Sequence, residues 1–253
     1  MKKQLLAALL AATATAAIAE ETVASSNAIG IMEVSSDKAR TIVAVPWTAI
    51  GTGNVAIGDL VLTDNLTTGD ILYAYDVDTG TYKAWQLNNG AWVSGTSVTL
   101  DGASAASESA GAYTVARGSA FWLERQTPTA SGSAKTFYLL GQVAEGTATT
   151  PFTAGSSSGS KWNLVANPTL AAKTLSVITS PSANDEIIFV AADGKPTKYA
   201  WKTVNNVTGW ATQVASEGPR PVKRWTLVNE SIPVGQGFWY VSTGAAPTIN
   251  WAL

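Results

Sequence analysis

The sequence contains no cysteine and no histidine, and it has few charged residues. Without cysteine the protein has no disulfide, no thiolate metal site and no cysteine nucleophile. Without histidine it has no Ser-His-Asp triad and no imidazole ligand or proton shuttle. Charged residues make up 13% of the 253 residues, about half the usual share of a soluble domain. A formal net charge of -2 makes nucleic acid an unsuitable partner.

The first 19 residues are typical of a secretory signal peptide. Met1-Lys2-Lys3 is a basic start, an Ala- and Leu-rich run follows, and Ala17-Ile18-Ala19 fits the small-x-small cleavage pattern. The apolar run falls short of the ~20 residues that a bilayer span needs, so a membrane anchor is the weaker interpretation. We therefore expect an exported protein, secreted, at the cell surface or in the periplasm of a bacterium, with no integral membrane span after cleavage.

The remainder of the chain reads as short β-strands. Segments rich in β-branched and aromatic residues alternate with Gly, Asn, Asp, Ser and Pro, as in all-β sandwiches and barrels. Turn residues at 76–80 and 88–90 predict two hairpins. The strands we expect are at 41–45, 71–75, 82–85, 91–93, 120–123 and 136–140.

A set of landmarks recurs along the chain, which predicts an internal duplication. The paired landmarks are separated by 115 to 118 residues and are Asp70 and Asp185, Trp85 and Trp201, Trp92 and Trp210, and Trp122 and Trp239. Val43-Ala44-Val45-Pro46 further matches Val165-Ala166-Asn167-Pro168. A unit of about 115 residues has the size of a domain rather than of a solenoid repeat.

We therefore predict two tandem related β-sandwich or β-barrel domains after a cleaved signal peptide. The expected divisions are the signal peptide at 1–19, a first β domain at 20–143 and a second at 161–253. A Ser-, Gly- and Thr-rich stretch at 144–160 separates them, as a linker or as a long loop of the second domain. The Ala- and Ser-rich stretch at 101–111 is expected to be a surface loop.

The second unit resembles a known repeat. Trp162-Asn163-Leu164-Val165-Ala166-Asn167-Pro168, a later Asp185-x-Ile187, Gly235-Gln236-Gly237-Phe238-Trp239-Tyr240 and a closing Trp251 are similar to the units of uncharacterised secreted bacterial all-β repeat proteins. The first unit fits more loosely, because Pro46-Trp47 replaces the Asn-Pro step. The resemblance implies export and an all-β fold, and it implies no established activity.

Paired carboxylates are the catalytic chemistry that this composition most readily allows. A glycosidase needs two carboxyl groups about 5–10 Å apart across a cleft. Asp70 and Asp185 recur at matching places, which favours a role in the fold. Asp76 and Asp78 suggest a calcium loop, but Leu87 stands where the bidentate glutamate of such a loop belongs, so a hairpin turn is favoured. We expect no enzymatic activity, no metal and no cofactor.

The tryptophans are the strongest candidates for binding. Trp85, Trp92, Trp201 and Trp210 lie on or beside the expected hairpins, where exposed rings would stack on sugars and buried rings would form the core. Packing in the core is the favoured interpretation. The basic segment Arg220–Arg224 could touch an anionic polymer, but a solvated loop is favoured.

The function that we expect is that of an exported, non-enzymatic structural or cell-surface protein. Low charge, abundant small residues and repetition without catalytic groups support it. It would associate with itself or with other surface proteins through unpaired β edges. The alternative is a carbohydrate-binding protein that uses exposed tryptophans, with polysaccharide as the partner. A carboxylate-based glycosidase is a distant third.

Overall fold

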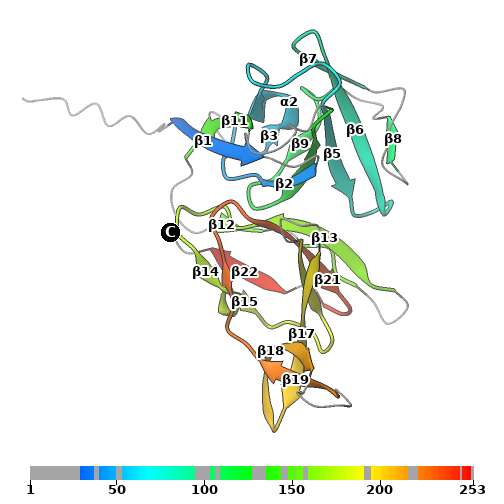
Figure 1. Cartoon of the computed structure of the whole chain (residues 1–253), viewed down its shortest axis with the longest axis vertical. Coiled ribbons are helices and arrows are strands. Elements are labelled where there is room, and N and C mark those ends of the chain that lie inside the picture. The colour runs from blue at the N-terminus through cyan, green and yellow to red at the C-terminus, as the bar shows by residue number, and fades with distance from the viewer. Residues whose placement is uncertain are drawn as a thin grey trace, which may run out of the picture.

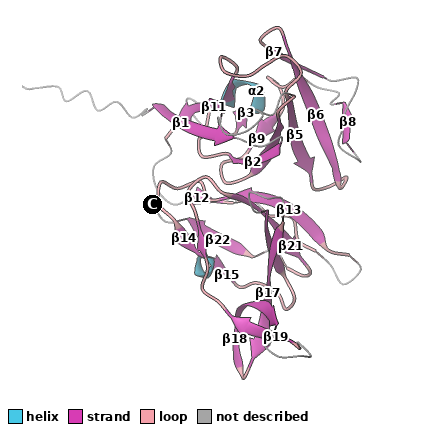
Figure 2. Ribbon diagram, in the orientation of Figure 1, coloured by secondary structure: helices cyan, strands magenta, loops and turns pink. Residues whose placement is uncertain are grey.

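The computed structural model describes residues 29–36, 40–49, 53–94, 103–105, 109–126, 135–143, 148–150, 152–155, 159–190, 195–215, 222–245 and 247–251. Strands account for 58% of them and helices for 4%, which confirms the all-β prediction. Figure 2 shows that strands and loops dominate the fold and that the helical segments are short. The expected signal peptide at 1–19 lies outside the described residues.

The described residues of the N-terminal half, between 29 and 143, form eleven strands and one helical turn. They are β1 (Ile29–Ser36), β2 (Arg40–Ala44), β3 (Val55–Ala56), α2 (Ile57–Leu60), β4 (Val61–Leu62), β5 (Ile71–Asp76), β6 (Thr81–Asn88), β7 (Ala91–Ser94), β8 (Ala103–Ala105), β9 (Thr114–Val115), β10 (Ala120–Glu124) and β11 (Lys135–Gln142). All six expected strands are present. Of the five further strands, β8 lies within the stretch that was expected to be a loop.

The described residues of the C-terminal half, between 148 and 251, form a similar set of strands, with a 3₁₀ turn in place of the helix. Its elements are β12 (Ala148–Thr149), β13 (Lys161–Ala166), β14 (Lys173–Thr174), η1 (Leu175–Val177), β15 (Ile178–Thr179), β16 (Glu186–Val190), β17 (Pro196–Val204), β18 (Val207–Ala215), β19 (Lys223–Leu227), β20 (Ser231–Ile232), β21 (Gly237–Ser242) and β22 (Thr248–Trp251). Strand β12 falls inside the 144–160 stretch and pairs with β22, so this stretch contributes to the second half.

The two halves have the same strand order. Small sheets of order β1-β11-β4 and β12-β22-β15 correspond, as do the large sheets β2-β10-β5-β6-β7 and β13-β21-β16-β17-β18 and the pairs β3-β9 and β14-β20. None of these sheets is closed within the described residues. Two strands break the correspondence: β8 pairs in parallel with β6 in the first half, and β19 extends the large sheet beyond β18 in the second.

Strand register shows which individual residues of the two halves correspond, and it corrects one of the landmark pairs taken from the sequence. Leu72 and Ile187 each stand two residues after the landmark aspartate, and they pair with Trp85 and Tyr199. Trp85 therefore corresponds to Tyr199 and not to Trp201, so that proposed match is wrong by two residues. The error arises because alternate residues share a face of a strand, so a shift of two keeps the side-chain pattern intact.

Paired left-handed residues form the tight turns of the equivalent hairpins β6–β7 and β17–β18. Asn89 and Gly90 have φ values of 49° and 81°, and Asn205 and Asn206 have values of 51° and 64°. A type I′ turn needs positive φ at both central positions, which Asn and Gly tolerate best. Local turn chemistry thus fixes both hairpins.

Each half has its own apolar core. The first includes Val43, Leu72, Trp85, Phe121 and Phe137, and the second includes Val165, Ile187, Trp210, Phe238 and Trp251. Figure 1 shows the halves one above the other, with the large sheets facing across the junction.

A third apolar cluster joins the halves through matching strands. It contains Ala44 and Ala120 of β2 and β10, and Leu164, Ala166 and Trp239 of β13 and β21. By register, β2 and β10 correspond to β13 and β21, so the contact is formed by the same face of each half. Such an arrangement is the intramolecular equivalent of an isologous dimer interface.

Polar bonds hold the same junction. The Ala166 N–H donates to Gly118 O at 2.8 Å. The Arg117 guanidinium donates to Pro46 O at 3.1 Å and to Pro168 O at 3.4 Å, which are counterparts in the two halves. Burial lowers the pKa of Arg117. The halves are therefore docked by both apolar and hydrogen-bonded contacts.

Candidate functional site

All four candidate tryptophans face the cores of their halves. Trp92 pairs with Leu87, which lies on the same face of β6 as Trp85, and Trp201 pairs with Trp210. Trp85 is 0% exposed and Trp210 is 3% exposed, whereas Trp92 and Trp201 are half-buried. Hiding a tryptophan removes about 150–250 Å² from water, so exposing Trp85 or Trp210 to stack on a sugar would be costly.

Trp201 and Trp210 are in contact but do not form a flat platform. Their ring centroids are 5.3 Å apart and the rings are inclined at 69° to each other. Such an edge-to-face pair is a packing arrangement of a core. Trp85 packs against Tyr113, with ring centroids 4.9 Å apart and the rings inclined at 44° to each other.

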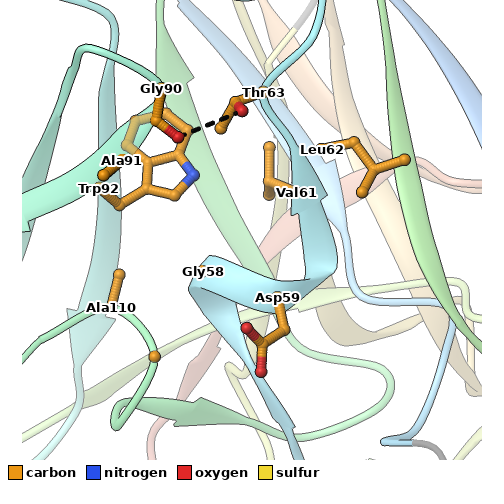
Figure 3. Close-up of a pocket in the computed structure, with 10 residues that line it drawn as sticks. Gly58, Asp59, Val61, Leu62, Thr63, Gly90, Ala91, Trp92 and Ala110 are labelled. Carbon is orange, nitrogen blue, oxygen red and sulfur yellow. Dashed lines mark hydrogen bonds between the residues drawn. The ribbon is translucent and has the colours of Figure 1, made fainter.

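Trp92 lines a pocket of about 410 Å³. Figure 3 shows the indole on one wall, with Val61 opposite and Asp59 at the far end. One wall comes from α2 and β4, one from β7 and its preceding turn, and one from the loop before β9. The lining residues are Gly58, Asp59, Val61, Leu62, Thr63, Gly90, Ala91, Trp92, Ala110 and Gly111.

Hydrogen bonds between the walls set the shape of the pocket. The Thr63 hydroxyl donates to Gly90 O at 3.3 Å across the rim, as the dashed line in Figure 3 marks. The Gly58 N–H donates to Ala110 O at 3.0 Å. A Cβ on Gly58 would approach Ala110 to 3.0 Å, so a glycine permits this close approach.

In the second half, a backbone hydrogen bond closes the position that corresponds to this pocket. The Val228 N–H donates to Trp210 O at 2.8 Å, and Val228 stands three residues before β20. Its counterpart, Gly111, stands three residues before β9 and lines the pocket together with Trp92. The two halves differ here because β8 of the N-terminal half pairs with β6, whereas β19 of the C-terminal half pairs with β18.

The pocket offers an aromatic face and several polar groups. Asp59 is exposed and Thr63 has a hydroxyl, whereas the Trp92 Nε1 is buried away from the pocket surface and has no hydrogen-bond partner among the described residues. These groups suit a polyhydroxylated ring better than an apolar ligand. Sequence reasoning identified Trp92 but missed Asp59 and Thr63, because strand order rather than any motif brings them beside β7.

A second cavity of about 240 Å³ lies at the junction of the halves. Tyr75 and Tyr113 from the first half and Phe152, Thr153 and Asn163 from the second contribute to its lining. Burial, and then the charge of Asp76, raises the pKa of Tyr75. The Asn163 side chain is already engaged with Thr153, accepting from its N–H at 2.8 Å and donating to its O at 3.2 Å.

Asp70 and Asp185 are buried parts of the fold. Each accepts a hydrogen bond from the N–H three residues before it, Thr67 at 3.0 Å and Ser182 at 2.8 Å. Asp70 also forms an ion pair with Arg125 at 3.1 Å. These contacts fit the expected role in the fold.

Asp76 belongs to a hairpin turn. Its Oδ1 accepts from the N–H groups of Asp78 and Thr79 at 3.0 and 3.2 Å. Burial alone would raise the pKa of Asp76, but these bonds and the charge of Lys83 hold it below its usual value. Nowhere in the described part of the chain do three potential ligands gather as a metal site requires.

The comparisons with known proteins add no family. The sequence matches no protein-family model, no curated protein and no solved structure. Among the described residues, no helix is long and apolar enough to cross a membrane.

Proposed function

We propose that this is an exported, non-enzymatic structural or cell-surface protein that associates with its own copies through β edges. The observation that carries the proposal is the position of two terminal strands. Within the described residues, β7 ends the large sheet of the first half and β19 ends that of the second. An edge strand presents unpaired N–H and C=O groups to a further strand.

The proposal includes a duplication of one β unit after a cleaved signal peptide, as in the secreted bacterial repeat proteins that the chain resembles. Matching strand orders support it, as does register. Val43 pairs with Phe121, and Val165 pairs with Phe238, which places the two Val-Ala segments at equivalent positions. The packing of aromatic side chains into both cores supports a structural role for most of the tryptophans.

The first experiment is size-exclusion chromatography and negative-stain electron microscopy of residues 20–253. Filaments, sheets or a defined large oligomer is the expected result. A monomer across the micromolar range, with no particles larger than one chain, would overturn self-association.

The alternative function is carbohydrate binding, now restricted to Trp92. The pocket of about 410 Å³ beside this indole is the observation that favours it. Binding to a panel of insoluble polysaccharides tests it, with Trp92→Ala and Asp59→Asn as variants. Loss of binding in both variants, with binding retained by Trp201→Ala, would support this function. Equal binding by Trp92→Ala and the parent protein would contradict it.

A further inference from the structure

We propose that the outer edge of β7 in one copy of the protein accepts β19 from the next copy. This inference rests on the proposed self-association and names the two strands that would carry it. The result would be one continuous sheet that runs from the first half of one molecule into the second half of its neighbour.

The acceptor argument comes from the internal comparison. In the second half, β18 is flanked by β17 on one side and β19 on the other. In the first half, the equivalent strand β7 is paired with β6, and within the described residues no strand pairs with its other side. The fold therefore carries an added antiparallel strand at this position in one half and leaves the position open in the other.

Register identifies the backbone groups that would receive the strand. Trp210 O accepts from Val228, so the N–H and C=O of Trp210 point away from β17. These groups alternate along an antiparallel strand, so Thr212 also points outward. The counterparts of Trp210 and Thr212 in β7 are Trp92 and Ser94. Their backbone groups thus face the open side.

The donor strand presents the complementary edge. Val228 points toward β18, so by alternation Thr226 and Arg224 do so too. The backbone groups of Lys223, Trp225 and Leu227 then point to the far side. Three outward residues are enough for a short antiparallel pairing with the four-residue β7.

Charge is compatible with pairing of β19 to β7. Lys223 and Arg224 begin β19 and both are exposed. Strand β7, Ala91–Ser94, carries no charged residue, and the exposed Asp59 lies beside it. The basic strand is therefore compatible with the edge of β7.

Position in the molecule determines the form of the assembly. Strand β7 lies at the upper end of the molecule in Figure 1, and β18 and β19 lie at the lower end. A contact between two different surfaces at opposite ends joins molecules head to tail, and it builds an open chain unless the rotation between neighbours closes a ring. Filaments are thus the form expected from this pairing.

Crosslinking tests the pairing, and because the sequence contains no native cysteine, only the introduced cysteines react. Val93→Cys on β7 and Thr226→Cys on β19 carry different tags and are mixed before treatment with a short bismaleimide. Adducts between the two variants should exceed the adducts within either variant. Ile31→Cys, on an exposed position of edge strand β1, is the matched control and should not crosslink to either partner. Dominant Val93–Val93 adducts would overturn the pairing in favour of a two-fold contact.

A backbone variant tests the same edge without a crosslinker. Ser94→Pro removes one outward N–H and leaves the bonds to β6, so it should raise the concentration needed for assembly by about tenfold. Ser94→Ala keeps the N–H and should assemble like the parent. Assembly of the parent with no effect of Ser94→Pro and no β7–β19 adduct would reject this inference alone. Failure of the parent protein to assemble would reject the proposed function itself.

Discussion

The hydroxyl of Tyr240 donates a hydrogen bond to the buried carboxylate of Asp185. Burial, and then this bond and the charge of Asp185, raises the pKa of Tyr240. The two residues join β21 to the turn before β16, and the Thr243 N–H donates to the same carboxylate at 2.7 Å. This network places a charged group inside the second core with several of its acceptor positions satisfied.

Removing the Tyr240 hydroxyl should therefore destabilise the protein. We expect Tyr240→Phe to lower the free energy of unfolding by about 1–3 kcal/mol, because a buried carboxylate loses a donor. Urea denaturation followed by tryptophan fluorescence measures it. Tyr199→Phe is the control, since Tyr199 packs in the same core and its hydroxyl has no hydrogen bond to Asp185. Equal losses in the two variants would show that the Asp185 contact contributes little.

A second prediction concerns alkaline pH at the junction of the halves. Tyr82 packs against Trp239 with ring centroids 6.3 Å apart, and burial raises its pKa to about 12. The unfolded chain has a tyrosine pKa of about 10, so the stabilisation is complete below pH 10 and is lost as the pH rises toward 12. Tyr82→Phe should lose less stability than the parent over that window. Parallel pH profiles of the two proteins would contradict this assignment.

Local chemistry made the strands and hairpins predictable from the sequence. Asn89-Gly90 encodes its turn within two residues, and the β-branched and aromatic segments on either side encode strands. The match of Trp85 to Trp201 was wrong because a shift of two residues preserves the side-chain alternation. The register depends instead on the partners of Leu72 and Ile187 across the sheet.

The candidate site was less predictable than the fold. Trp85 and Trp92 share a face of one hairpin, yet one is fully buried and the other lines a pocket. The difference comes from β8, which crosses to β6 from a stretch of Ala and Ser with no strong strand pattern. No residue spacing within the hairpin encodes that crossing. The sequence therefore identified the tryptophans as candidates but did not show which of them lines a pocket.

A third prediction tests the packing of Trp47 against two glycines. A Cβ on Gly141 would lie 2.3 Å from Trp47 Cβ, and a Cβ on Gly30 would lie 2.6 Å from its ring. Gly141→Ala should therefore cost about 1–3 kcal/mol of stability through overpacking. Gly111→Ala is the control, because a Cβ there meets nothing within 4 Å. A double-mutant cycle of Gly30→Ala with Trp47→Ala should abolish most of the cost of Gly30→Ala, because the atoms that a Cβ on Gly30 meets belong to the Trp47 ring, and additive costs would contradict the contact.

The last prediction concerns the cooperativity of the two halves. Gly237 lies at the junction, where a Cβ would come 2.1 Å from Ile42 Cγ2 and 3.1 Å from the Cβ of its counterpart Ala120. Because Gly237 and Ala120 occupy equivalent positions, an added methyl group pushes the facing sheets apart at the centre of their contact. Each half retains its own core, so Gly237→Ala should weaken the docking more than either core. Differential scanning calorimetry should then resolve two transitions in place of one. Gly159→Ala, where a Cβ meets nothing within 4 Å, should retain the transition of the parent. A single transition shifted to lower temperature in Gly237→Ala would mean that the junction is an integral part of one cooperative unit.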